Sequence, residues 1–309
     1  MKNLLLSLAG FLLSVNIYSQ ENFKIASGSA ILDTWIYPKT NSETVILLHG
    51  GPGVPTPMDE IKLLLKDNYQ VIYFHQRGVG ESFVEDGNYQ LDSYLNDITN
   101  IADYFSAEKF HLYGHSWGGL YAQIYSQENP NRILSLFLAS PASGTGSQWD
   151  ETEDEVLSFN ESKTNFWQFV SMGYFSLVGM LGFDSGYQCL FKIVLNNYNF
   201  GFEVPEQDLS WMESIKSEPI NKTRSILSNY DLLKDAQSVN FPVTITYGEK
   251  DIYGKSKKHV IDRFPNATVL EIPNSGHLPA IHNFEGFRKI FAAHFNIYDS
   301  FLSAKLTEQ

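Results

Sequence analysis

Residues 110–119 read Phe-His-Leu-Tyr-Gly-His-Ser-Trp-Gly-Gly, and the organisation of the whole chain can be worked out from this segment. A β-prone run leads into the Gly-x-Ser-x-Gly pattern, and a helix-compatible segment follows, from Leu120 to Gln127, until Asn129-Pro130 stops it. This order predicts a nucleophile elbow, a sharp strand-to-helix turn that holds a serine in a strained backbone conformation. The glycines let neighbouring chains pass closer than a Cβ atom would permit. Ser116 would then lie at a helix N-terminus, where backbone N–H groups favour negative charge.

Apolar runs on both sides of this turn predict the strands of a parallel sheet. Continuous apolar segments of about five residues are typical of strands buried on both faces. Segments with apolar residues at helical spacing lie between them, the longest being Leu91 to Phe105. The alternation predicts an α/β fold with a doubly wound, mostly parallel sheet. The predicted strands cover residues 31–37, 44–48, 70–74, the run from Phe110 that leads into Gly114, 133–139, 241–247 and 268–272.

The alternation stops after Pro141, and no buried-strand run occurs again until about residue 237. The intervening segment begins with the acidic stretch Asp150 to Glu155 and contains two aromatic-rich parts, Phe166 to Phe183 and Tyr187 to Phe202. We interpret it as a mostly helical insertion that forms a cap over the carboxyl edge of the sheet. The predicted division is residues 1–19, a signal peptide; 20–141, the first part of the core; 142–236, the helical cap; and 237–309, the second part of the core.

The N-terminal segment has the features of a secretory signal peptide. Lys2 supplies a positive charge, and residues 4–15 form a mostly apolar run that is too short to span a bilayer. Ser19 is a small residue suited to cleavage before Gln20. We therefore expect an exported protein, periplasmic or secreted, with no stable membrane span in its mature form.

Composition limits the possible ligands. The net charge is −13 and basic clusters are missing, so nucleic acid is not an expected partner. The single cysteine, Cys189, cannot form an internal disulfide. No cluster of metal-ligating residues is visible in the sequence, and no cofactor is implied. The oligomeric state stays open.

A serine nucleophile requires a base and an acid elsewhere in the chain. Of the eight histidines, His277 is the one that follows a predicted strand end in a glycine-containing loop, where it can face Ser116. Asp251 lies in the turn after the preceding strand and can fix the tautomer of that imidazole. The oxyanion hole needs two N–H donors. Trp117 follows the nucleophile and supplies one, and the loop after the 44–48 strand supplies the other, for which Gly51 is the first choice.

These motifs resemble those of the α/β-hydrolase superfamily over nearly the whole mature length, and the order Ser116, Asp251, His277 is the order found there. Three segments together resemble the prolyl iminopeptidase group, which removes N-terminal proline from peptides. They are His-Gly-Gly-Pro-Gly at 49–53, Gln-Arg-Gly-x-Gly-x-Ser at 76–82, and Gly-His-Ser-Trp-Gly-Gly at 114–119. By this resemblance Ser116, Asp251 and His277 form a catalytic triad, and Gly51 and Trp117 donate to the oxyanion.

The chain departs from the pattern of that group in two respects. His75 stands where relatives usually carry Asp before Gln-Arg-Gly. The cap glutamates that hold the substrate amine in the group have no clean match, and Glu213 and Glu218 are the candidate substrate-binding residues. The first hypothesis is an aminopeptidase acting on small peptides. The alternatives are a carboxylesterase or other acyl hydrolase with an apolar cap pocket, acting on an ester, and a non-catalytic binding protein on a hydrolase scaffold.

Overall fold

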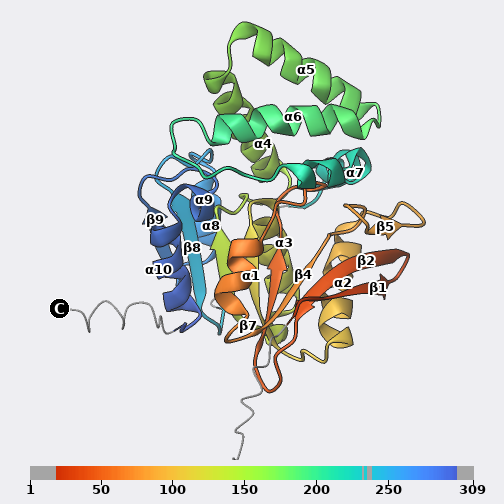
Figure 1. Cartoon of the computed structure of the whole chain (residues 1–309), viewed down its shortest axis with the longest axis vertical. Helices are drawn as coiled ribbons and strands as arrows, with labels where there is room; N and C mark the ends of the chain where they lie inside the picture. Colours follow the sequence, from red (N-terminus) through yellow and green to blue (C-terminus); the bar gives the residue numbers. More distant parts are fainter. Residues whose placement is uncertain (1–18, 232, 235–238, 298–309) are drawn as a thin grey trace, which may run out of the picture.

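The computed structural model describes residues 19–231, 233–234 and 239–297, so the predicted signal peptide before Ser19 lies outside the described residues. Within them a nine-stranded sheet has the order β1-β2-β4-β3-β6-β7-β8-β9, with β5 paired to β2. The strands are β1 Glu21–Ser27, β2 Ala30–Tyr37, β3 Thr44–Leu48, β4 Gln70–Phe74, β5 Phe83–Val84, β6 Phe110–His115, β7 Ile133–Ala139, β8 Val243–Gly248 and β9 Thr268–Ile272. The pairings from β4 through β3 to β9 are parallel, whereas β1-β2 and β2-β4 are antiparallel. The predicted mostly parallel sheet is confirmed (Figure 1).

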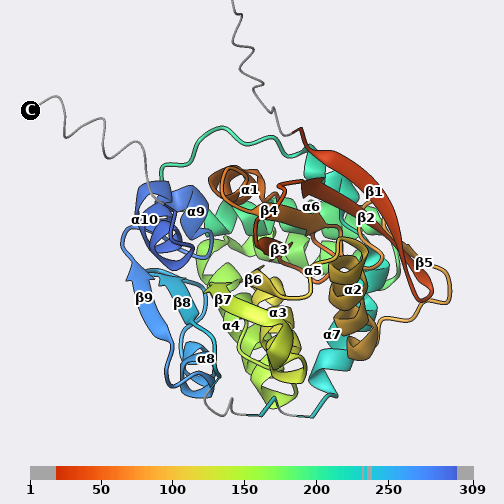
Figure 2. The ribbon, with the colours of Figure 1, turned by 90° about the horizontal axis from the view of Figure 1, so that it is seen from below.

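Helices cover both faces of this sheet, as the view from below shows (Figure 2). One face carries α1 (Asp59–Leu65) and α10 (Phe284–His294), with the short α9 (Pro279–His282) beside them. The other face carries α2 (Leu91–Tyr104), α3 (Trp117–Glu128) and α8 (Lys257–Arg263). A 3₁₀ turn, η1 (Pro130–Arg132), joins α3 to β7. Each face therefore has its own apolar layer, which is why the strands between them read as continuous apolar runs.

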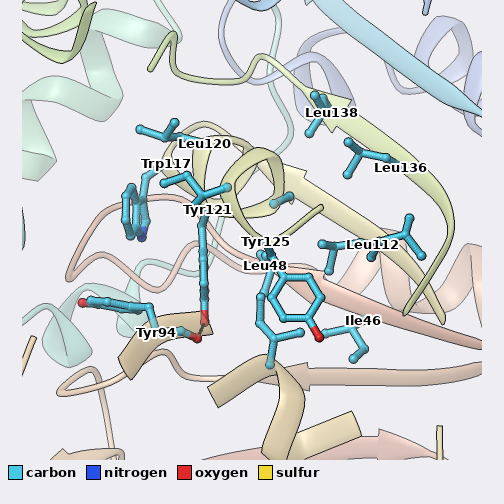
Figure 3. Packing of buried hydrophobic residues seen from close by; sticks show 14 of the residues in the cluster. Ile46, Leu48, Tyr94, Leu112, Trp117, Leu120, Tyr121, Tyr125, Leu136 and Leu138 are labelled. Carbon is cyan, nitrogen blue, oxygen red and sulfur yellow. Dashed lines mark hydrogen bonds between the residues drawn. The ribbon is translucent and has the colours of Figure 1, made fainter. Parts of the chain in front are cut away.

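The larger apolar layer surrounds α3 and fixes the helix that begins at the predicted elbow (Figure 3). Trp117 stacks on Tyr121 with ring centroids 5.8 Å apart, and Tyr94 of α2 meets both rings edge-on. The Tyr121 hydroxyl also donates to the backbone carbonyl of Tyr94. Residues Leu48 and Leu112 of β3 and β6 lie in the same layer. The start of α3 is thus held by packing on two sides.

The segment between β7 and β8 is helical in its described part and lies over the carboxyl ends of the strands (Figure 1). It consists of α4 Ser147–Lys163, α5 Phe166–Met180, α6 Asp184–Tyr198, the 3₁₀ turn η2 Ser210–Ser214, and α7 Ser217–Ser228. A third apolar cluster joins it to the loop after β3 and contains Val54, Tyr187, Met212, Ile215 and Ile220. The approach is close, because a Cβ atom on Gly53 would lie 2.4 Å from Ile220 Cγ1. The loop that carries Gly51 is therefore clamped between the sheet and the cap.

The aromatic-rich part of the cap does not all enter a core. Helix α5 packs on α6 and α7, and its outer face stands at the end of the molecule farthest from the sheet (Figure 1). Trp167 is 75% exposed, and Phe166, Tyr174 and Phe183 are also exposed. Aromatic side chains usually pack in a core, and those of this helix do not, because no second layer covers it within the described part of the chain. None of the described helices is both long enough and apolar enough to cross a bilayer.

Buried histidines predict that the fold loses stability in acid. Burial lowers the pKa of His49 to about 3 and that of His75, His115 and His294 to about 4. These groups bind protons more readily in the unfolded chain, so stability is fully present above about pH 6.5 and is lost as the pH falls toward about 4. Each such histidine should cost on the order of 2 kcal/mol of unfolding free energy at pH 5. Urea titrations from pH 7.5 to 4.5 measure this slope.

One histidine offers a matched variant for that measurement. The His294 ring nitrogens lie 2.8 Å from Ser135 Oγ and 2.8 Å from Thr244 Oγ1, away from the carboxyl edge of the sheet. His294→Gln removes one titrating group. It should reduce the slope of unfolding free energy against pH by the contribution of about one bound proton. An unfolding free energy that stays constant from pH 7 to pH 5 in the wild type would contradict the prediction.

Candidate active site

Ser116 lies between β6 and α3 in a conformation that non-glycine residues rarely adopt. Its φ is 55° and its ψ is −120°. The flanking glycines are required by close backbone contacts. A Cβ on Gly114 would lie 2.2 Å from the Gly118 carbonyl oxygen, and one on Gly118 would lie 2.3 Å from the Leu48 carbonyl oxygen. The local geometry is that of the predicted elbow, which turns the serine side chain out of the strand while the backbone stays packed.

The structure brings Ser116, His277 and Asp251 together from three separate segments. Ser116 Oγ lies 3.0 Å from His277 Nε2, and His277 Nδ1 lies 3.1 Å from Asp251 Oδ1. Asp251 follows β8 and His277 follows β9, so all three residues are at the carboxyl edge of the sheet. The side chains of His277 and Asp251 are 3% and 0% exposed, while Ser116 is partly exposed. Ser116 is therefore the one of these three residues whose surface is partly open to solvent, while the side chains of its two partners are buried.

Asp251 is held as a carboxylate in spite of its burial. Burial alone would raise its pKa, but the nearby His277 and hydrogen bonds from His277, Ser140 and the Tyr253 amide bring the pKa below its usual value. Ser140 Oγ donates to Oδ2 at 2.6 Å, and the Tyr253 N–H donates to Oδ1 at 3.2 Å. The Gly248 N–H also reaches Oδ2, at 3.3 Å. These donors fix both oxygens, so Oδ1 faces His277 in one orientation.

The His277 imidazole is enclosed by aromatic rings. The rings of Tyr253, His115 and Tyr198 have centroids 4.9, 5.1 and 5.2 Å from it. His115 Nε2 also lies 2.9 Å from the His277 carbonyl oxygen, and burial lowers the pKa of His115 to about 4, so a neutral imidazole donates there. His282 Nδ1 accepts from the Gly276 N–H at 2.9 Å. The backbone of the loop is thus held at two adjacent residues, at the N–H of Gly276 and at the carbonyl of His277.

The two predicted oxyanion donors lie next to each other. Trp117 is the first residue of α3, where backbone N–H groups have no acceptor within the helix. A Cβ on Gly51 would lie 3.6 Å from Trp117 Cδ1. Gln76 ties the two segments together: its Nε2 donates to the His49 carbonyl at 2.8 Å, and its Oε1 accepts from Trp117 Nε1 at 2.7 Å. The three motif segments of the sequence therefore meet at one place.

His75 directly follows β4 and lies among aromatic rings next to Gln76. Its ring lies 4.7 Å from that of Trp35 and 6.3 Å from that of His49, centroid to centroid. Its Nδ1 is buried and makes no hydrogen bond within the described residues. Burial lowers its pKa to about 4, so the side chain is neutral near pH 7. The change from the acidic residue expected by resemblance therefore places no charge beside the triad.

The candidate substrate-binding residues Glu213 and Glu218 lie on the cap surface. Both side chains are exposed. Glu218 pairs with Lys222 at 2.8 Å and accepts from the Tyr89 hydroxyl at 3.3 Å. Among the described residues, neither side chain makes a hydrogen bond or an ion pair with a triad residue, and their role stays a prediction.

A different cap glutamate is partly buried. Glu153 lies on α4 between Trp149 and Val156, which pack on the core, and its Oε1 is 2.8 Å from Arg224 Nε on α7. Burial raises the pKa of Tyr198, whose ring lies against His277, and the charge of Arg224 opposes that rise. Glu153 could not be singled out from the sequence because it belongs to the acidic run 150–155, which is typical of a solvated helix start.

Tyr253, Ser140 and Glu155 were also missed. Tyr253 Oη lies 3.3 Å from Ser116 Oγ. Glu155 accepts hydrogen bonds from the N–H groups of the three residues that follow Tyr253, namely Gly254, Lys255 and Ser256. The position of Tyr253 two residues after Asp251 was the available signal. Among the described residues, no group of three or more His, Cys, Asp or Glu is arranged to hold a metal ion.

Comparisons with known proteins identify the fold family of the chain. A family model described as alpha/beta hydrolase fold matches residues 43–284. A proline iminopeptidase of Lactobacillus helveticus is 31% identical over 127 residues, which are 39% of this chain and 43% of that protein. The match with that relative therefore spans less than half of the relative's length. A proline iminopeptidase of Clostridioides difficile is 23% identical over 273 residues, covering 82% of this chain and 90% of that protein.

A solved structure shows the same fold at low identity. The proline iminopeptidase of Mycobacterium smegmatis superposes with a TM-score of 0.64 and 17% identity, covering 88% of this chain and 97% of its own. At this level of identity the likeness concerns the fold.

Proposed function

Because the chain belongs to the α/β-hydrolase fold family, we propose that it is a serine hydrolase with Ser116 as nucleophile, His277 as base and Asp251 as the residue that orients the base. One observation carries the proposal: the continuous contact from Ser116 Oγ to His277 Nε2 and from His277 Nδ1 to Asp251 Oδ1, at 3.0 and 3.1 Å. This is the geometry that lets an imidazole accept a hydroxyl proton while a carboxylate fixes its tautomer.

Acylation follows from these positions. Ser116 Oγ attacks the carbonyl carbon of the scissile bond, and its proton passes to His277 Nε2. The carbonyl oxygen becomes negatively charged and accepts hydrogen bonds from the Gly51 and Trp117 N–H groups. His277 then gives its proton to the leaving amine or alcohol, and the acyl group stays on Oγ. In the second half of the reaction, a water molecule takes the place of the leaving group and gives a proton to His277 Nε2 as it attacks the acyl-enzyme. His277 returns that proton to Ser116 Oγ, and the acid is released.

The proposed substrate class is small peptides with a free N-terminus, cleaved in the manner of a prolyl iminopeptidase. The Lactobacillus and Clostridioides relatives, both proline iminopeptidases, support this class, as do the three motif segments that meet at Gln76. Export of the mature chain is part of the proposal, supported by Lys2 and the apolar run at residues 4–15. Sequencing the N-terminus of protein recovered outside the cytoplasm tests the cleavage site.

An aminopeptidase must compensate the charge of the substrate ammonium, because burying it unpaired costs several kcal/mol. Glu213 and Glu218 are exposed, and exposed ion pairs contribute about 1 kcal/mol or less. Glu153 lies on the face of α4 that carries Trp149 and Val156 and is partly buried, at 35% side-chain exposure, so a substrate ammonium would share its carboxylate with Arg224. We therefore add Glu153 to the candidate anchors and rank it first.

The aminopeptidase proposal predicts a strong preference for a free amine. Proline arylamide should be hydrolysed with a kcat/KM at least about 100-fold above that of N-acetylproline arylamide, since acetylation removes the charge that a carboxylate recognises. Glu153→Gln should lower kcat/KM for the free amine by about 10- to 150-fold, the range for a hydrogen bond to a charged group. It should leave the rate on a short p-nitrophenyl ester within about threefold of the wild-type rate.

Glu213→Gln and Glu218→Gln are the matched surface variants. A larger loss in either of them than in Glu153→Gln would return the anchor to the position expected from the sequence. Equal rates for the free and acetylated substrates would reject the aminopeptidase and favour the carboxylesterase alternative.

A further inference from the structure

The nucleophile has a second hydrogen-bonding neighbour that belongs to none of the assigned roles. Tyr253 Oη lies 3.3 Å from Ser116 Oγ, on the loop after Asp251. We propose that Tyr253 is a further catalytic residue, whose hydroxyl donates to Ser116 Oγ and favours the departure of Oγ from the acyl-enzyme. This inference rests on the proposed serine hydrolase function and deepens it.

Tyr253 is fixed in place by contacts with every member of the triad. Its side chain is almost fully buried, and its ring meets the His277 ring edge-on at 4.9 Å and 84°. Its backbone N–H donates to Asp251 Oδ1 at 3.2 Å. The following three N–H groups donate to Glu155 on α4, at 2.8, 2.7 and 3.3 Å. The hydroxyl therefore points at Oγ because the backbone on both sides of it is held.

The direction of the hydrogen bond follows from the single proton on Ser116 Oγ. His277 Nδ1–H donates to Asp251, so Nε2 is the acceptor for the Oγ proton. Oγ then has only lone pairs to offer Tyr253, and the phenol must donate. Burial raises the pKa of Tyr253 well above its usual value, which keeps the phenol protonated at working pH.

The two halves of the reaction use this donor differently. In the free enzyme Oγ is a hydroxyl oxygen and already accepts the bond, so acylation gains little from it. In the acyl-enzyme Oγ is an ester oxygen, which is a weaker acceptor. When the second tetrahedral intermediate collapses, the carbon–Oγ bond breaks, its electron pair returns to Oγ, and the His277 proton follows. A donor aimed at Oγ stabilises that charge and favours loss of Oγ over loss of the attacking water.

The test is Tyr253→Phe, which keeps the ring and removes the hydroxyl. With a p-nitrophenyl ester, the burst of nitrophenol should stay close to one per active site, while the steady-state rate falls by about 10- to 100-fold. Mass spectrometry should find the acyl group accumulated on Ser116. The kcat/KM for an arylamide, which reports acylation, should change by less than about threefold. Tyr69→Phe is the matched control, since it removes a buried hydroxyl that donates to the Phe295 carbonyl at 2.5 Å, far from the triad.

Three outcomes would overturn the inference. They are an unchanged steady-state rate, an equal fall of acylation and deacylation, and a loss of rate that Tyr69→Phe reproduces through lower stability. Failure of the proposed function itself gives a different result, because wild-type protein would then show neither a burst nor an acyl group on Ser116. Urea unfolding of both variants separates a folding defect from a kinetic one.

Discussion

Replacing Ser116 with alanine should lower kcat by about six orders of magnitude and abolish covalent labelling by a fluorophosphonate. The hydroxyl is the atom that forms the acyl-enzyme, and no other described hydroxyl is in contact with both His277 and a partly open surface. Any remaining rate comes from substrate binding and the oxyanion donors, which the substitution leaves in place. Active-site titration and intact-protein mass spectrometry measure both effects.

Ser126→Ala is the control for that experiment. Ser126 is a buried serine within α3, and its hydroxyl donates to the Gln123 carbonyl at 2.9 Å. It should be labelled and turn over substrate like the wild type. Labelling that persists in Ser116→Ala would mean that another residue is the nucleophile, and an absence of labelling in the wild type would favour the non-catalytic alternative.

Strands buried on both faces could be predicted from the sequence almost to the residue. The runs at 44–48, 70–74 and 133–139 coincide with β3, β4 and β7. The run at 268–272 coincides with β9, which is apolar in sequence although it is an exposed edge strand. The strands at the opposite edge of the sheet could not be predicted in the same way. β1 alternates polar and apolar residues and is exposed along most of its length, and β5 has only two residues. Their pairing with β2 depends on contacts between distant segments rather than on a local apolar run.

The elements of the site show a similar division. Ser116, Asp251 and His277 could be placed together because each follows a predicted strand of one parallel sheet, and such strand ends share an edge. No comparable rule predicts from the sequence which side chains of the cap lie near the site. Which face of α4 points inward depends on packing against α6 and α7, so Glu153 could not be distinguished from its acidic neighbours. Tyr253 was missed for another reason, since the hydrogen bonds that aim it come from Glu155, about 100 residues away.

Replacing Asp251 with asparagine should lower kcat by about four orders of magnitude while the chain stays folded. The carboxylate accepts four hydrogen bonds, two on each oxygen, from His277 and the Tyr253 amide and from Ser140 and the Gly248 amide. Asparagine offers only one oxygen, so its NH₂ group must face one pair of donors. When the NH₂ faces His277, Nδ1 becomes the acceptor, Nε2 carries the proton, and Ser116 loses its base.

The matched control is Ser140→Ala, which keeps the charge of Asp251 and removes only the donor at 2.6 Å. It should lower kcat by no more than about 100-fold, the effect of one hydrogen bond to a charged group. Rates on a proline arylamide and a p-nitrophenyl ester should fall in parallel in Asp251→Asn, because both substrates need the same base. A fall of less than about tenfold would show that the tautomer of His277 is set by another contact, and the buried environment of its ring leaves His115, Tyr198 and Tyr253 as the groups to examine.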